Sequence, residues 1–227
     1  MTVVLLMTVR SWRRRRQFWG KRLKTIYLLR HGETEWNRAG RLQGHRDSPL
    51  TPRGRAQAVA MGRTLRQIVG ARPTLRMVSS PLGRTRQTAR AVAEVLGLDP
   101  VGIAEDPRLM EHGFGVWEGE LQAELSHKFL EIWQAREADK WGYQVPGGES
   151  YALVARRLTD WFAEQPDGAE VLVVGHGLAG RILRGLYLRA GPEEIFAMAE
   201  PQDALFRLCE GVATRFDAAE DVANRAP

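Results

Sequence analysis

The sequence predicts an α/β protein, a three-layer α/β/α sandwich with a mostly parallel central sheet. Two apolar runs, TIYLLR at 25–30 and EVLVVG at 170–175, are typical of strands buried on both faces of a sheet. Segments of helical period lie between the two runs, as the crossovers between parallel strands require. With 227 residues and 44% hydrophobic content, the chain can bury one substantial core, so we expect one folded domain.

The first half of this domain is predicted to run strand, loop, helix, strand, helix. After the strand at 25–30, a long loop leads to Thr51, which is suited to cap the helix that Pro52 begins. The run LRMVSS at 75–80 is predicted as a strand, and 83–98 as the helix that follows it.

The second half is predicted to end in an antiparallel hairpin. Residues 121–141 are polar and aromatic with a helical period, and they end near the turn VPGGES. A helix is expected over 149–164, followed by the strand at 170–175 and a helix at 178–188. The runs ALFRLCEG and VATRFDA then form the final hairpin.

The net charge of +6 comes from the amino-terminal end of the chain. Residues 1–24 hold eight of the 33 Lys and Arg and none of the 27 Asp and Glu, which leaves the rest at −2. We therefore expect a poorly ordered basic extension at 1–24 and a domain at 25–227. The apolar run of the extension precedes its arginines, whereas in a secretory signal the basic residues come first. The run is also too short to cross a bilayer. The four-arginine run could contact nucleic acid or an anionic membrane, but we favour a solvated tail. A start codon assigned too early is one explanation for such a tail.

The cysteine content limits the chemistry. The chain has a single cysteine, Cys209, so an internal disulfide framework is excluded, and no neighbouring Cys or His suggests a zinc site. We expect a protein of the reducing cytoplasm that needs no metal and no cofactor.

Charged side chains follow three of the predicted strands. LLRHG supplies Arg30 and His31, VSSPLGRTRQTA supplies Arg84, and VVGHG supplies His176. Ligands of open α/β sheets bind at the carboxyl ends of the strands, so we expect these side chains to lie together. Two imidazoles and several guanidinium groups would bind a tetrahedral dianion, and phosphate is the predicted ligand.

The same charges favour a histidine nucleophile. Nearby guanidinium groups lower the pKa of an imidazole, and a neutral imidazole nitrogen can attack phosphorus. The sequence has no P-loop, carboxylate cluster or metal-ligand spacing near these residues. We therefore expect the arginines to supply the positive charge that magnesium supplies elsewhere.

Several motifs in order carry a family resemblance. The blocks are RHGETEWN, RLQGHRDSPLTPRG, SSPLGRTRQTA, LMEHGFGVWEG, PGGES and VVGHG. Over about residues 25–190 they resemble the histidine phosphatase superfamily, the phosphoglycerate mutase-like proteins, and most of all its small broad-specificity phosphatase branch. The resemblance implies a phosphoglycerate mutase-like fold and phosphoryl transfer through a phosphohistidine.

The resemblance also implies roles for single residues. His31 would be the residue that is phosphorylated, and His176 would complete the catalytic phosphate site. Glu111 falls where the family places its proton donor to the leaving oxygen, and a carboxyl group next to an anionic substrate suits a general acid.

Four further positions are expected to bind the substrate. Arg30 and Arg84 would hold the phosphate, and Asn37 of RHGETEWN would contact the phosphate or the rest of the substrate. Gly177 would let the ligand approach the backbone closely and offer its N–H. No metal ligand is expected.

Other residues of these blocks lie at the surface or have two alternative roles. Arg86 is expected at the surface, while Arg41, Gln43 and His45 either line the entrance or face solvent. Aromatic residues could form an apolar roof for the substrate or simply pack the roof segment on the core. They are Trp36, Phe114, Trp117, Trp133, Trp141 and Tyr143.

The predicted function is a phosphomonoesterase that hydrolyses small phosphorylated metabolites. A phosphoglycerate mutase would use the same pocket, but the short interval between Glu111 and Glu149 favours an open site that admits water. A non-enzymatic protein that binds a phosphate ligand, or nucleic acid through its basic tail, is the third alternative. The expected partner is a small phosphorylated substrate; nucleic acid is not expected, and a homodimer is left open.

Overall fold

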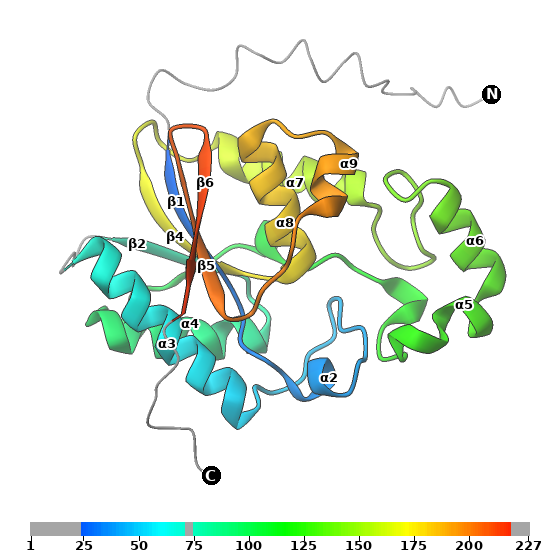
Figure 1. Ribbon diagram of the computed structural model, residues 1–227, viewed down its shortest axis with the longest axis horizontal. Coiled ribbons are helices and arrows are strands. Elements are labelled where there is room, and N and C mark those ends of the chain that lie inside the picture. Colours follow the sequence, from blue (N-terminus) through cyan, green and yellow to red (C-terminus); the bar gives the residue numbers. More distant parts are fainter. Residues whose placement is uncertain (1–23, 71–74, 219–227) are drawn as a thin grey trace.

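A six-stranded mixed sheet forms the centre of the computed structural model, which describes residues 24–70 and 75–218 (Figure 1). The strand order is β3-β2-β4-β1-β5-β6. The first four of these strands pair in parallel, whereas β5 runs antiparallel to β1 and β6 antiparallel to β5. The strands are β1 (Thr25–Arg30), β2 (Arg76–Ser79), β3 (Ala104–Glu105), β4 (Glu170–Gly175), β5 (Ala204–Cys209) and β6 (Val212–Asp217). The predicted α/β sandwich and its terminal hairpin are confirmed.

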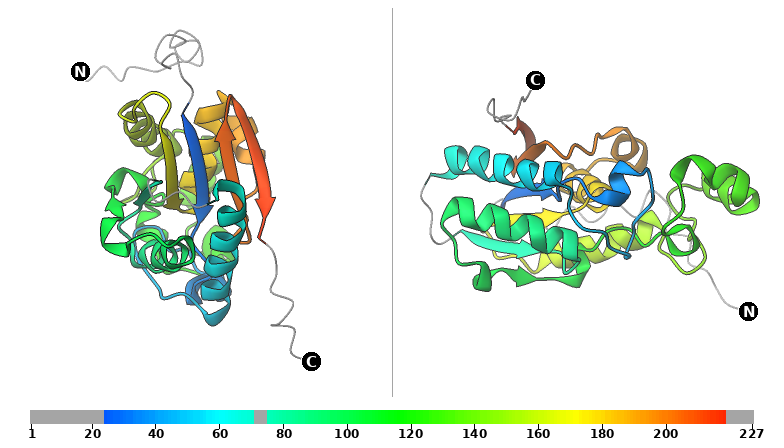
Figure 2. Two further views of the ribbon diagram at one scale, coloured as in Figure 1. Left: turned by 90° about the vertical axis from the view of Figure 1, so that its left-hand side faces the viewer. Right: turned by 90° about the horizontal axis from the view of Figure 1, so that it is seen from below.

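Four long helices cover the two faces of the sheet (Figure 2). They are α3 (Pro52–Val69) and α4 (Gly83–Leu96) on one face, and α7 (Tyr151–Ala163) and α8 (Gly177–Leu188) on the other. Short helices are α2 (Glu35–Arg38), α5 (Leu125–Lys128), α6 (Leu130–Ala138) and α9 (Pro192–Ala197). Single 3₁₀ turns lie at Pro100–Gly102, Pro107–Leu109, Gly115–Trp117 and Gln122–Glu124.

The alternation of side chains along the strands creates two hydrophobic cores. In β1, Ile26 and Leu28 pack toward α7 and α8, whereas Tyr27 and Leu29 pack toward α3 and α4. Successive residues of a strand point to opposite faces, so a continuous apolar run is what a strand covered on both sides requires. The apolar character of the run at 25–30 therefore has a direct structural cause.

The start of α3 is fixed by the residues that the sequence indicated. Thr51 Oγ1 accepts the N–H of Gly54 at 2.9 Å, and a proline occupies the first turn. The loop after β1 lies directly on this turn: a Cβ added to Gly32 would lie 2.1 Å from the Gly54 carbonyl oxygen. Glycine is required there because two backbones touch.

The segment 121–141, which has a helical period, contains two short helices with a break between them. Phe129 adopts φ −129° and ψ 47°, so α5 ends there and α6 begins again. The two helices form an arm that projects to one side of the sheet (Figure 1). A separate small core of Trp117, Leu125 and Val145 holds the arm, with Trp133 and Tyr143 packed against it. Several of the roof aromatics therefore have a packing role.

The described chain begins with a packed residue. Lys24 is buried, and its Nζ donates to the Phe162 carbonyl oxygen at 2.8 Å. Residues 1–23 lie outside the described part of the chain, so the division into an extension at 1–24 and a domain at 25–227 stays a prediction.

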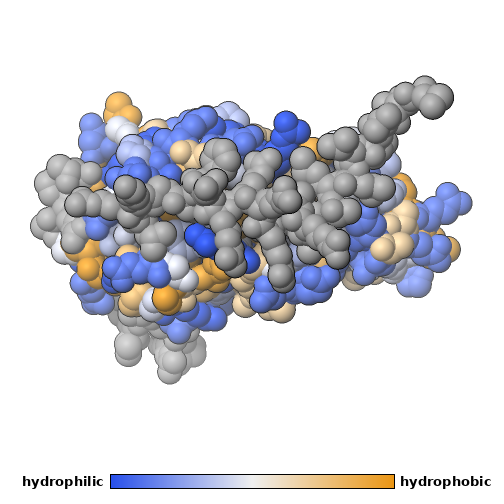
Figure 3. Space-filling model, turned by 90° about the horizontal axis from the view of Figure 1, so that it is seen from above, coloured by the Kyte–Doolittle hydropathy of each residue, from blue (hydrophilic) through white to orange (hydrophobic). Residues whose placement is uncertain are grey.

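The surface is mostly hydrophilic with scattered apolar residues on the face that Figure 3 shows. The large hydrophobic residues that are exposed belong to different elements: Val101, Val116, Leu130, Leu153 and Val212. Within 24–70 and 75–218, no helix has both the length and the apolar content needed to cross a bilayer.

Candidate active site

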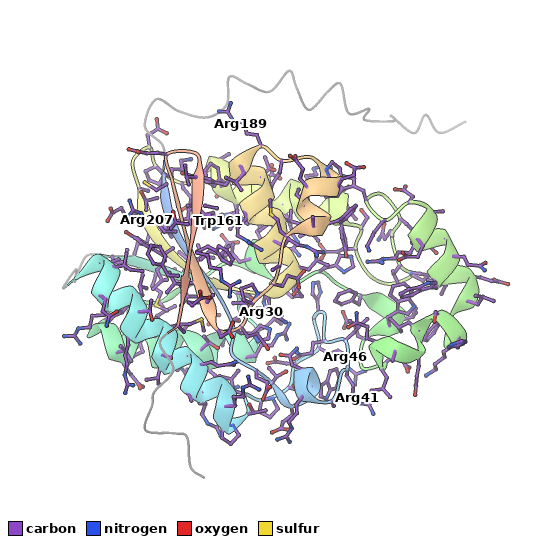
Figure 4. The ribbon with its side chains drawn as sticks, viewed as in Figure 1. Arg30, Arg41, Arg46, Trp161, Arg189 and Arg207 are labelled. Atoms are coloured by element: carbon purple, nitrogen blue, oxygen red, sulfur yellow. The ribbon has the colours of Figure 1, made fainter. Side chains whose placement is uncertain are left out.

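The predicted site residues lie at the carboxyl ends of β1, β4 and β2. Arg30 ends β1 opposite Gly175, the last residue of β4, and Ser80 directly follows β2. The three strands are neighbours and parallel, so their ends meet at one edge of the sheet. Figure 4 shows Arg30 at this end of β1, in the same part of the view as Arg46.

His31 is held as a neutral imidazole whose unprotonated nitrogen is defined by its hydrogen bonds. Its side chain is almost fully buried, its Nδ1 lies 2.8 Å from the Gly32 carbonyl oxygen, and Arg84 Nε donates to its Nε2 at 3.3 Å. The carbonyl oxygen requires the hydrogen on Nδ1, so Nε2 carries a lone pair. Burial holds the pKa of His31 well below its usual range, and the charges of Arg84 and Arg30 lower it further. A nitrogen in this state is able to attack an electrophile.

One loop orients the guanidinium of Arg84, which is fully buried at the start of α4. Its Nη2 donates to the Gly44 carbonyl oxygen at 2.8 Å, and its Nη1 to the Arg46 carbonyl oxygen at 2.8 Å and to Asp47 Oδ1 at 3.0 Å. We call residues 44–47 the clamp loop. With its two terminal nitrogens fixed, Arg84 points its Nε at His31.

His176 lies beside His31 at the end of β4. The two ring centroids are 5.3 Å apart, and His176 Nε2 lies 2.8 Å from Ser80 Oγ. Burial lowers the pKa of His176 well below its usual range, with Arg84 and His31 adding to the effect. In the described part of the chain, its buried Nδ1 has no hydrogen-bond partner, so this nitrogen is available to a ligand.

Gly177 begins α8 directly against Arg30. A Cβ at position 177 would lie 3.1 Å from Arg30 Cζ and 2.5 Å from Glu200 Oε2, so a side chain there would displace both groups. Arg30 Nη1 donates to the Glu200 carbonyl oxygen, and its buried Nε has no partner among the described residues. Arg30, His176 and Gly177 together line a pocket.

Glu111 places its carboxyl group at the start of α8. Its Oε1 accepts the N–H of Ala179 at 2.9 Å, and its Oε2 accepts the N–H of Leu178 at 3.2 Å. These backbone N–H groups have no acceptor within the helix, so the carboxyl group supplies one. The carboxyl group therefore lies next to the His176–Gly177 pair, beside the phosphate-binding candidates.

Asn37 has a structural role in this structure. Its Oδ1 accepts the N–H of Thr34 at 3.2 Å, which caps α2, and also accepts Gln202 Nε2 at 2.8 Å. These bonds tie α2 to the segment before β5. A contact between Asn37 and the substrate stays a prediction.

Sequence comparison assigns the family. Residues 26–209 match the histidine phosphatase superfamily (branch 1). The chain belongs to this superfamily. It is 39% identical over 158 residues to a protein of Serratia proteamaculans (strain 568) described as probable phosphoglycerate mutase GpmB, covering 68% of this chain and 70% of that protein.

Two solved structures of the same fold are named as phosphatases. The alpha-ribazole phosphatase from Shigella flexneri is 25% identical with a TM-score of 0.70, covering 86% of this chain and 95% of that one. The mycobacterial glucosyl-3-phosphoglycerate phosphatase, solved with VO₃, is 30% identical with a TM-score of 0.67, covering 82% and 90%. Histidine phosphatase membership thus agrees with the resemblance that the motifs indicated.

Sequence reasoning missed several residues that hold the histidine phosphatase site together. Ser80 and Asp47 lie within quoted motif blocks, but only the fold shows that they contact His176 and Arg84. Arg86, predicted at the surface, pairs with Glu105 there. Across the described residues, no group of three or more His, Cys, Asp or Glu is arranged to hold a metal ion.

Proposed function

We propose that this chain is a metal-independent phosphomonoesterase that hydrolyses small phosphorylated metabolites through a phosphohistidine. The observation that carries the proposal is the state of His31: Nδ1 is tied to the Gly32 carbonyl oxygen, and Nε2 faces Arg84. A phosphate bound by Arg84 would lie within reach of that nitrogen.

The first chemical step transfers the phosphoryl group to the protein. The lone pair of His31 Nε2 forms a bond to phosphorus, and the ester P–O bond breaks. Glu111, protonated for this step, gives its proton to the leaving oxygen, so a neutral alcohol departs. Arg30, Arg84 and His176 hold the phosphoryl oxygens.

The second step restores the enzyme. A water molecule attacks phosphorus, the P–N bond breaks, and the Glu111 carboxylate takes the proton that the water loses. Inorganic phosphate leaves, and Glu111 is again protonated for the next substrate.

The groups that neutralise the charge of the phosphate are proposed to be arginines. Two guanidinium groups lie at the site: Arg84 points its Nε at His31, and Arg30 has a buried Nε without a partner among the described residues. Guanidinium N–H groups are strong donors to phosphate oxygens. In this scheme the arginines stabilise the charge of the five-coordinate phosphorus, a role that magnesium has in many kinases and ATPases. The mycobacterial relative was solved with VO₃, an anion of the class that this pocket is proposed to bind.

Phosphoryl transfer to a second hydroxyl group is the alternative, because the 39% identical relative is described as a probable phosphoglycerate mutase. The two activities differ in the acceptor of the phosphoryl group, water or an alcohol. Product analysis with 3-phosphoglycerate separates them: a phosphatase releases inorganic phosphate, whereas a mutase yields an isomer.

The experiment that tests the proposal traps the intermediate. Wild-type protein quenched during turnover of a radiolabelled ester should carry acid-labile, alkali-stable label, and the His31→Ala variant should carry none and hydrolyse no p-nitrophenyl phosphate. Activity should survive treatment with EDTA, and vanadate should inhibit. Substantial activity in His31→Ala would refute the histidine mechanism, and loss on chelation restored by a divalent ion would refute metal independence.

A further inference from the structure

One exposed side chain contacts the backbone of the proposed acid. His45, in the clamp loop, is 41% exposed at its side chain. Its Nε2 nevertheless lies 2.9 Å from the Glu111 carbonyl oxygen and 3.6 Å from Glu149 Oε2. Nothing in the two chemical steps above uses this histidine.

The Glu111 carbonyl oxygen is held from a second side by α7. Arg157 Nη2 donates to it at 2.9 Å, and Arg157 Nη1 donates to the Met110 carbonyl oxygen at 2.8 Å. Glu149 connects the two donors, because its carboxylate pairs with Arg157 at 2.9 Å and lies 3.6 Å from His45 Nε2. It also accepts the N–H of Gly113 at 2.9 Å. The backbone around Glu111 is thus fixed by a charged network, and His45 is its solvent-facing member.

The network keeps His45 a hydrogen-bond donor. The nearby carboxylate of Glu149 raises the pKa of His45, although partial burial opposes this change. The carbonyl oxygen of Glu111 accepts only, so the hydrogen lies on Nε2 in either charge state.

The position of His45 in the clamp loop joins two parts of the site. Neighbouring residues of this loop hold Arg84, while His45 holds the loop segment that carries Glu111. Glu118 fixes the loop in turn, because its carboxylate accepts the N–H groups of His45 at 2.9 Å and of Arg46 at 3.2 Å. Phosphate binding and proton donation therefore share one support.

We infer that His45 is a positioning residue for proton transfer: its Nε2–H fixes the Glu111 backbone so that the carboxyl group stays at the start of α8, aimed at the leaving oxygen. The inference rests on the proposed function, because it takes Glu111 to be the acid. It predicts that His45 affects the rate only where protonation of the leaving group matters.

The test compares two substrates and four variants. Glycerol 2-phosphate has a poor leaving group, so on this substrate His45→Ala should lower kcat about fivefold, with KM unchanged. A fivefold change corresponds to the net contribution of about one hydrogen bond. On p-nitrophenyl phosphate, which needs little protonation, kcat should barely change. His45→Gln, whose amide can donate in place of Nε2, should recover most of the loss. In a Glu111→Gln background, His45→Ala should cause no further loss on either substrate.

The matched control is His127→Ala, which removes another exposed histidine, on α5. This variant should leave kcat and KM unchanged on both substrates. A higher KM on both substrates in His45→Ala would mean that His45 contacts the substrate instead, and additive losses with Glu111→Gln would place its effect elsewhere; both results overturn the inference alone. If Glu111→Gln lowers kcat equally on both substrates, Glu111 is not the acid. This part of the proposed function then fails together with the inference.

Discussion

At the scale of single residues, two identical side chains in the site differ through their hydrogen bonds. His31 has Nδ1 tied to a backbone carbonyl and Nε2 directed at Arg84, whereas His176 has Nε2 tied to Ser80 and a buried Nδ1 with no partner in the described part of the chain. A nitrogen that faces a guanidinium group is placed to meet a bound phosphate. This asymmetry supports His31 as the nucleophile and His176 as a phosphate ligand.

Replacement of Glu111 by glutamine tests the acid at the same scale. The variant keeps the shape of the side chain but removes the transferable proton, so kcat on alkyl phosphates should fall by about 10²-fold or more. An activated aryl ester should lose far less, because its leaving group departs without protonation. Steady-state rates on a series of esters of different leaving-group pKa check this, and a loss that is the same along the series would assign Glu111 to phosphate positioning.

The residues that the motifs indicated and those that they did not differ in a physical way. His31, Arg84 and His176 follow predicted strands, so the rule for strand ends places them together. His45 and Arg157 act through backbone carbonyl groups, and any donor of suitable length could do so. A sequence carries little signal for such contacts, because a backbone carbonyl group is the same at every residue.

At the scale of elements, the start of α8 is the structural centre of the site. His176 directly precedes it, Gly177 begins it against Arg30, and Glu111 accepts two of its free N–H groups. Sequence patterns predicted α8 and α3 closely because apolar period and capping are local. They predicted a helical period over 121–141 but not the break that separates α5 from α6, because Phe129 is neither Gly nor Pro.

Two glycines of α8 offer a matched pair of substitutions. Gly177→Ala places a Cβ 2.5 Å from Glu200 Oε2 and 3.1 Å from Arg30 Cζ, so it should displace Arg30 and weaken inhibition by vanadate by about tenfold. Gly180→Ala meets only Leu28 Cδ2 at 3.6 Å, an ordinary contact, and should leave inhibition unchanged. Alanine at 180 also favours the helix, by up to about 1 kcal/mol. Equal inhibition constants for the two variants would show that Arg30 does not need the space at Gly177.

At the scale of the whole molecule, the interior contains several histidines that are buried in neutral form. His31 and His176 have pKa values well below the usual range, and burial lowers the pKa of His112 to about 4. His112 packs edge-on against Phe114 and Tyr151, and its Nε2 lies 2.7 Å from the Glu149 carbonyl oxygen. The arrangement that keeps imidazoles neutral for chemistry also makes the fold sensitive to acid.

The free energy of unfolding should therefore fall as the pH falls below about 6.5, the usual histidine pKa in an unfolded chain. Between that pH and about 4, the unfolded chain binds a proton at His112 that the folded chain does not, so stability is lost as the pH decreases and is fully present above the window. His112 alone accounts for about 3 kcal/mol by pH 4, and His31 and His176 act in the same direction.

Urea unfolding at pH 7, 6, 5 and 4.5 measures the slope of the free energy of unfolding against pH. His112→Phe keeps an aromatic ring against its neighbours but cannot be protonated, so its slope should be shallower than that of the wild type. A wild-type free energy of unfolding that stays constant or rises as the pH falls from 6.5 would show that these imidazoles accept protons inside the folded protein.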